Sequence, residues 1–167
     1  MSGKVFYDTN WNAFPDAGEP GISGAAVNLR WRDGSLYQST STGADGSYGF
    51  NEVFPFFSWL VAEVDFARYR ATGATIVVDG GGPVLPDQGW TFPSFDRLNP
   101  QVQNLVNPHT GNALSRTAPG PVLTQAFQAF LGQTNVIDWG KREYGPNENG
   151  GISGLVVYDV TRAEDDP

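Results

Sequence analysis

Short alternating segments separated by Asp-Gly turns dominate the first half of the chain. In residues 25–31 (AAVNLRW) every second residue is apolar, namely Ala25, Val27, Leu29 and Trp31. This period of two is typical of a strand with one buried face. An Asp-Gly pair at 33–34 predicts a hairpin that returns through residues 36–42. A second Asp-Gly turn at 45–46 precedes a long apolar strand in residues 56–66. Strands this short, joined by such turns, predict antiparallel sheets and an all-β sandwich.

The chain loses this pattern after residue 71. Most of residues 72–131 is rich in Gly, Pro, Asn and Gln, with little periodicity. Irregular segments of this length are uncommon inside a compact domain, so we interpret this one as a long, mostly irregular insertion. Within it, Leu123, Phe127 and Phe130 repeat at helical spacing, which predicts one short helix over residues 121–132.

The end of the chain repeats its beginning. The Gly-Ile-Ser-Gly motif of residues 21–24 returns at 151–154, and GKVFYD at 3–8 is paralleled by GLVVYD at 154–159. An internal repeat of this kind predicts tandem modules. The division that we expect is a sandwich over residues 1–144 with its insertion at 72–131, a linker at 145–150, and the first strand of a following, truncated repeat at 151–167.

The composition narrows the classes of partner. The formal net charge is −8, from 18 acidic and 10 basic residues, and this field repels nucleic acid and anionic membrane surfaces. The chain has no cysteine, which excludes disulfides, thiolate metal sites and a cysteine nucleophile. It shows no apolar run of membrane-spanning length and no signal-peptide pattern. We therefore expect no membrane insertion, and for an exported protein a signal upstream of this chain.

Oxygen-bearing side chains concentrate in residues 8–19 (DTNWNAFPDAGE) at the spacing of a calcium-binding loop. With Asp8 as position one, side-chain oxygens fall at positions one, three, five, nine and twelve, and position seven supplies a backbone carbonyl. The predicted ligands are Asp8, Asn10, Asn12, Phe14, Asp16 and Glu19. Ca²⁺ takes about six to eight oxygen ligands, and a final bidentate Glu suits it. The alternative is a plain Asx- and Pro-rich turn, and Ala13 stands at position six, where the sharp turn prefers Gly.

The segments GKVFYDTNWNAFPDAGEPGISGAAVNL and TSTGADGSYGF resemble the SdrD B-like domain, the B-type repeat of bacterial serine-aspartate repeat surface proteins, which is related to the collagen-adhesin B-type fold. The segment GQTNVIDWGKREY is similar to the final strand of that family. The resemblance covers residues 3–66 and 132–144. It implies an immunoglobulin-like or prealbumin-like β-sandwich, tandem repetition, an extracellular or cell-surface location and structural Ca²⁺ in the loop. Thr161 and Ala163 fall where Asn10 and Asn12 stand in the first copy, so the second copy is expected to lack calcium.

These features predict a calcium-stabilised spacer module of a large multidomain extracellular protein, with the neighbouring modules of the same polypeptide as its partners. They do not predict an enzyme. The single histidine, His109, lies in a turn context, and the sequence has no nucleophile, metal or phosphate motif around it. Glu63 and Asp65 alternate on one strand face, where we expect solvated edge charges.

Three alternatives stay open. The aromatic residues of the insertion, with others near the end of the sandwich, could form a platform for a carbohydrate or protein ligand. Those residues are Trp90, Phe92, Phe95, His109, Trp139 and Tyr144. The repeat start is also similar to modules of large secreted proteins, some resembling multicopper oxidases, which suggests an accessory domain of such an enzyme. In related collagen-adhesin domains a buried acid assists a strand lysine to attack an asparagine and form an isopeptide bond. Here Lys4 or Lys141 would be the lysine, and Glu63 or Asp65 the assisting acid.

Overall fold

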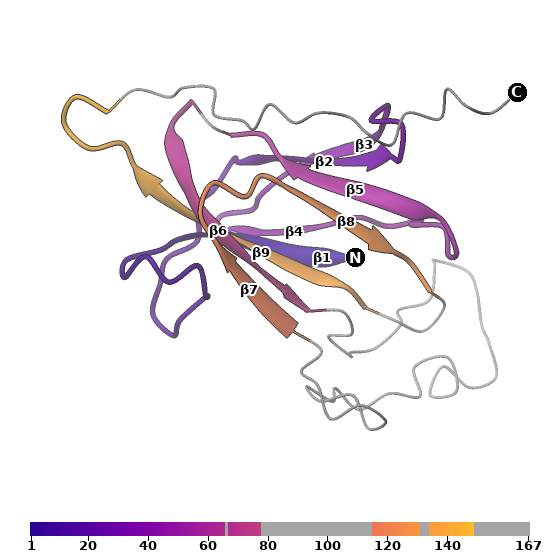
Figure 1. Ribbon diagram of the computed structural model, residues 1–167, viewed down its shortest axis with the longest axis horizontal. Coiled ribbons are helices and arrows are strands. Elements are labelled where there is room, and N and C mark those ends of the chain that lie inside the picture. Colours follow the sequence, from indigo (N-terminus) through magenta and orange to yellow (C-terminus); the bar gives the residue numbers. More distant parts are fainter. Residues whose placement is uncertain (66, 78–114, 131–133, 149–167) are drawn as a thin grey trace, which may run out of the picture.

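The computed structural model describes residues 1–65, 67–77, 115–130 and 134–148, and these residues form strands joined by turns (Figure 1). No helix occurs in this part of the chain. The strands are β1 (Ser2–Tyr7), β2 (Ala26–Trp31), β3 (Leu36–Ser41), β4 (Ser47–Gly49), β5 (Ser58–Glu63), β6 (Tyr69–Val77), β7 (Ser115–Pro119), β8 (Thr124–Gln128) and β9 (Val136–Glu143).

The strands form two sheets that pack face to face as a sandwich. One sheet has the order β4-β1-β9-β6-β7 and the other has the order β3-β2-β5-β8. Neighbouring strands are antiparallel except β1 and β9, which run parallel. The all-β sandwich expected from the sequence is confirmed.

The hairpin of β2 and β3 forms where the alternation and the Asp-Gly pair predict it. Val27 and Leu29 are fully buried, as an inward-facing stripe requires. Gly34 takes a φ of 86°, which a residue with a Cβ adopts only at a cost. The Asp33 carboxylate accepts a hydrogen bond from the Ser35 N–H at 2.9 Å and fixes the turn.

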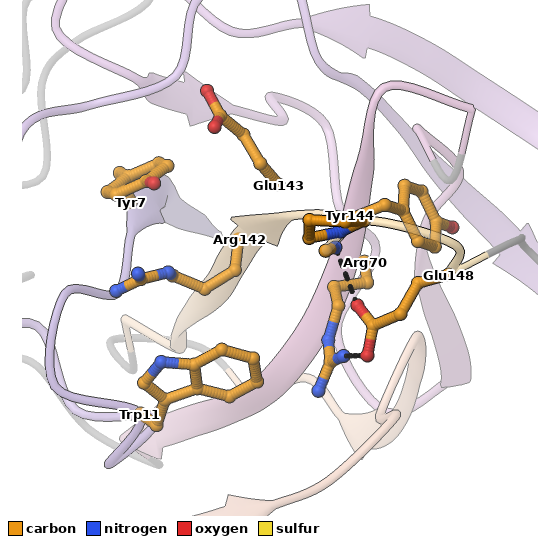
Figure 2. Close-up of a pocket in the computed structure, with 9 residues that line it drawn as sticks. Tyr7, Trp11, Arg70, Arg142, Glu143, Tyr144 and Glu148 are labelled. Atoms are coloured by element: carbon orange, nitrogen blue, oxygen red, sulfur yellow. Dashed lines mark hydrogen bonds and ion pairs between the residues drawn. The ribbon is translucent and has the colours of Figure 1, made fainter.

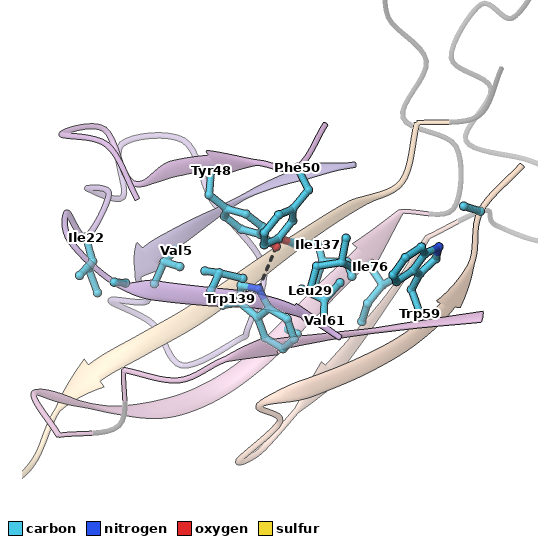
Figure 3. Packing of buried hydrophobic residues seen from close by; sticks show 14 residues of the cluster. Val5, Ile22, Leu29, Tyr48, Phe50, Trp59, Val61, Ile76, Ile137 and Trp139 are labelled. Carbon is cyan, nitrogen blue, oxygen red and sulfur yellow. Dashed lines mark hydrogen bonds between the residues drawn. The ribbon is translucent and has the colours of Figure 1, made fainter. Parts of the chain in front are cut away.

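The core lies between the two sheets (Figure 3). It is built from apolar side chains of β1, β2, β5, β6 and β9, together with Tyr48 and Phe50 at the end of β4. The largest fully buried apolar members are Trp59, Trp139, Phe6, Leu29, Ile137, Val5, Val27 and Val61. Burial of such side chains contributes about 1.5 to 3 kcal/mol each, so the packing of the sheets is the main source of stability.

The helix expected over residues 121–132 is wrong, because residues 124–128 form β8. The backbone of β8 pairs with β5, from Ser58 opposite Gln128 to Ala62 opposite Thr124. Phe127 packs against the core while its neighbours face outward, which is the alternation of a strand. Pairing with an existing sheet therefore overrides the helical spacing of the phenylalanines.

Other parts of the expected insertion also belong to the sheets. Residues 72–77 continue β6, and β7 pairs with it up to Val77 opposite Ser115. The segment 78–114, with Trp90, Phe92, Phe95 and His109, lies outside the described residues. The repeated segment 151–167 and part of the expected linker also lie outside them.

Asp138 in β9 gives the sandwich a testable pH dependence. Burial raises the pKa of this carboxyl group from 3.8 to about 6, against the opposing effect of a hydrogen bond from the Lys4 backbone N–H at 2.8 Å. The folded chain thus holds this proton more tightly than the unfolded chain, so the stability that Asp138 contributes is complete below pH 3.8 and falls as the pH rises to about 6.

We therefore expect Asp138→Asn, which keeps an acceptor for Lys4, to be more stable than the wild type at pH 7 by on the order of 1 to 2 kcal/mol. The difference should shrink towards pH 4. Urea denaturation of both proteins at pH 4, 5, 6 and 7 measures it. A difference that stays constant with pH would contradict the prediction.

Candidate metal-binding loop

The loop of residues 8–19 leaves the end of β1 and is fastened at both of its ends. The Asp8 N–H donates to the Lys141 carbonyl of β9 at 2.9 Å, and the Tyr7 N–H donates to the Pro20 carbonyl at 2.8 Å. Gly21 then forms an isolated antiparallel bridge with Phe6. The two ends of the loop therefore lie side by side.

Asp8 begins the loop as a fully buried carboxylate. Its Oδ2 accepts a hydrogen bond from the Ala13 N–H at 2.9 Å, and its Oδ1 accepts one from the Asn12 N–H at 3.2 Å. The chain is thus curled around the Asp8 side chain. A Cβ on Gly140 would lie 3.2 Å from Asp8 Oδ2, so the absence of a side chain there leaves room for the carboxylate.

Three of the predicted ligands meet at Asp16. The amide groups of Asn10 and Asn12 both donate to Asp16 Oδ2, each at 2.7 Å. The amide oxygens accept from backbone N–H groups two residues further along, Asn10 from Asn12 and Asn12 from Phe14. These are Asx turns, which bend the chain at successive donor positions.

Glu19 closes the loop and is almost completely buried. Its Oε1 accepts from the backbone N–H and the hydroxyl of Thr9, each at 2.7 Å, and its Oε2 accepts from the Asp16 N–H at 3.1 Å. Glu19, at position twelve, therefore joins Thr9 at the start of the loop to Asp16 at position nine.

The backbone of the loop is strained at Trp11 and Ala13, which have φ angles of 66° and 62°. This confirms the sharp turn at position six, where Ala13 replaces the preferred Gly. The Ala13 carbonyl accepts from the Thr75 hydroxyl at 2.7 Å, and a Cβ on Gly73 would lie 2.4 Å from the Ala13 methyl group. Contacts with β6 thus offset a strain on the order of 1 kcal/mol.

The electrostatics of the loop fit a cation. Asp8, Asp16 and Glu19 carry three negative charges, and no cationic side chain of the described residues pairs with any of them. A buried carboxylate without a counter-charge is costly. In the described structure the loop's three carboxylates do not form one cluster, so amide and carbonyl oxygens would have to complete a metal shell. Carboxylate, amide and carbonyl oxygens are the donors that Ca²⁺ prefers.

Comparison with known proteins finds a family match for part of this chain. Residues 2–75 match the SdrD B-like domain. The matched segment contains the whole loop and β1 to β5, with most of β6. The resemblance predicted from the sequence is confirmed over this segment.

The chain is also similar to individual curated proteins. Serine-aspartate repeat-containing protein D of Staphylococcus aureus strains Newman, MW2 and NCTC 8325 is 41% identical over 49 residues in each case. That alignment covers 29% of this chain and 4% of each relative. Among the described residues, no helix is long and apolar enough to cross a membrane.

Beside the loop of residues 8–19 lies a pocket of about 500 Å³ that the sequence does not reveal (Figure 2). Its lining combines aromatic rings with side chains of both charges. The main lining residues are Tyr7, Trp11, Arg70, Arg142, Glu143, Tyr144 and Glu148. Arg70 and Arg142 come from β6 and β9, which pair side by side, but they are far from the loop in sequence.

The expectation that Glu63 is a solvated edge charge is wrong. Glu63 is 1% exposed, and its Oε2 lies 2.6 Å from Nζ of the equally buried Lys141. The inward alternation of β5, which also buries Trp59 and Val61, brings Glu63 between the sheets. Asp65, two residues further on, forms an ion pair with Arg68.

In the described part of the chain, exposed aromatic rings lie at residues other than those expected to form a platform. Trp139 is 1% exposed and belongs to the core, so it cannot present its face to a ligand. Exposed rings occur instead at the end of the sandwich where β5 begins, at Phe54, Phe56 and Phe57. Their signal in the sequence is FPFF at residues 54–57. Partly buried Trp31 and Tyr37 lie beneath, with ring centres 5.0 Å apart.

Proposed function

We propose that this chain is a calcium-stabilised structural module of a larger extracellular or surface protein, and that residues 8–19 are its calcium site. The observation that carries the proposal is the pair of buried carboxylates, Asp8 and Glu19, without cationic partners in the described structure. A plain Asx turn would leave its acids in water, where no counter-charge is needed.

The ligands would be the side chains of Asp8, Asn10, Asn12, Asp16 and Glu19, with the carbonyl of Phe14. A bound Ca²⁺ would supply positive charge that offsets the three carboxylates. The loop already curls around Asp8 and is closed by Glu19, so these residues would bring their oxygens together at a small cost in chain entropy. Because the loop joins β1 to the segment before β2, the ion would stabilise the contact between the two sheets.

The family match supports a wider structural role. SdrD B-like domains are repeat domains and not an enzyme family, and the relatives are far longer than this chain. We infer that the module acts as a spacer, with neighbouring modules of the same polypeptide as its partners and without catalysis of its own. A surface location is consistent with the net charge of −8 and with the absence of cysteine, since a metal can replace disulfides as a staple.

Calcium is expected to stabilise the chain by about 2.7 kcal/mol at a hundredfold excess over its dissociation constant. Thermal melts with EDTA and with added Ca²⁺ measure this, and titration calorimetry gives the affinity. Asp16→Asn and Glu19→Gln keep hydrogen-bond acceptors but remove charge, and each should abolish most of the calcium-dependent rise in Tm.

Asp45→Asn is the matched control, because Asp45 also holds a turn by accepting from the Ser47 N–H, at 3.0 Å, but lies outside the loop. It should keep the full response to calcium. Melts of the wild type that coincide with and without Ca²⁺ would show that residues 8–19 are only a polar turn.

A further inference from the structure

The first residues of the loop are held by a guanidinium group between two aromatic rings. The Arg142 guanidinium carbon lies 5.1 Å from the centre of the Tyr7 ring and 5.2 Å from that of Trp11 (Figure 2). Arg142 also donates to the Thr9 carbonyl at 2.6 Å and to the Asp8 carbonyl at 3.3 Å. The conformation of the loop is thus tied to β9.

Trp11 also contacts a second guanidinium group, which connects it to the turn that follows β9. The Arg70 guanidinium carbon lies 4.3 Å from the centre of the Trp11 ring, and Arg70 forms an ion pair with Glu148. The Glu148 carboxylate accepts from the Gly145 N–H at 2.7 Å, and the Glu148 N–H donates to the Gly145 carbonyl at 3.0 Å. The turn at residues 145–148, which follows β9, is therefore joined to the loop through Arg70 and Trp11.

Trp11 has a left-handed backbone conformation that its own burial does not explain. It is a bulky residue with a φ of 66°, yet the residue is 46% exposed, so burial does not account for the strained backbone. It stands between Asn10 and Asn12, both of which donate to Asp16. A cation bound by these neighbours would fix the Trp11 ring, and a fixed ring would hold the Arg70 guanidinium in line with Glu148.

We propose that the loop 8–19 and the turn 145–148 are energetically coupled through Trp11, Arg70 and Glu148, so that ordering of either one orders the other. The calcium-dependent part of this coupling rests on the proposed function, whereas the contacts themselves do not. The turn directly follows β9, so the coupling transmits the state of the loop to the residues that follow that strand. Coupling between sites is reciprocal, which means that a change in the turn must alter the affinity of the loop for its ion.

The first experiment measures calcium affinity by titration calorimetry in the wild type, Glu148→Gln and Asp65→Asn. Asp65 forms the comparable pair with Arg68, whose guanidinium lies 5.4 Å from the Tyr69 ring centre, and it does not contact the loop. Both variants remove one negative charge, so the general electrostatic effect is matched. Glu148→Gln should weaken calcium binding about fivefold relative to Asp65→Asn. Equal affinities of the two variants would overturn the calcium-dependent coupling.

A second experiment needs no metal. The N–H groups of Asn12 and Ala13 donate to Asp8 and report on the formed loop. Their hydrogen exchange in calcium-free protein should be several times faster in Glu148→Gln than in Asp65→Asn. Failure of the wild type to bind calcium would defeat the proposed function alone, and this exchange would still decide the coupling. Equal exchange rates in the two variants would overturn it.

Discussion

Lys141→Met is expected to lower the free energy of unfolding by about 3 to 5 kcal/mol. The lysine side chain is 1% exposed, and its Nζ lies 2.6 Å from Glu63 Oε2. Removing the ammonium group would leave Glu63 as a charge in the core with one remaining hydrogen bond from a backbone group, the Asp65 N–H at 2.7 Å. An uncompensated buried carboxylate costs several kcal/mol. Guanidinium denaturation at neutral pH measures the loss.

A double replacement distinguishes a costly unpaired charge from a merely damaged core. Lys141→Met combined with Glu63→Leu removes both charges and keeps apolar volume, and buried pairs replaced in this way often lose little stability. We expect the double variant to recover most of the loss, whereas Glu63→Gln alone should be about as unstable as Lys141→Met. A double variant that is no more stable than Lys141→Met would show that the pair is not the source of the effect.

This pair also shows what the sequence could not predict. Glu63 ends β5 in one sheet and Lys141 lies in β9 of the other, 78 residues away. Their separate contexts are those of ordinary strand charges, and only the packing of the two sheets brings them together. The same holds for Arg70, which meets Glu148 from an equal separation of 78 residues.

Local features were predicted where one segment contains all of the information. The β2–β3 hairpin follows from an alternating strand and an Asp-Gly turn, both within about a dozen residues of each other. The loop 8–19 is likewise continuous, and its bending at Ala13 was expected from its position in the spacing. The sequence does not predict β8, because Phe127 and Phe130 fit a helical period. The neighbour that selects the strand, β5, is more than sixty residues away in the chain.

Trp139→Ala is the second change expected to cost about 3 to 5 kcal/mol. Trp139 lies in β9, a central strand of its sheet, and is 1% exposed among the core side chains (Figure 3). Its Nε1–H donates to the Tyr48 hydroxyl at 2.9 Å, and that hydroxyl donates to the Ile137 carbonyl at 2.7 Å. Truncation would therefore leave a large cavity and take a donor from a buried hydroxyl group.

The cost of the cavity and the cost of the lost hydrogen bond can be measured separately by comparing Trp139→Ala with Tyr48→Phe and with the double variant. Tyr48→Phe keeps the ring but leaves the Trp139 N–H without its acceptor, at a cost of about 1 to 3 kcal/mol. Because Trp139→Ala already removes that N–H, adding Tyr48→Phe should cost less than Tyr48→Phe does in the wild type. Strictly additive losses, measured by urea denaturation, would mean that the hydrogen bond contributes nothing and that Trp139 stabilises the sandwich by its volume alone.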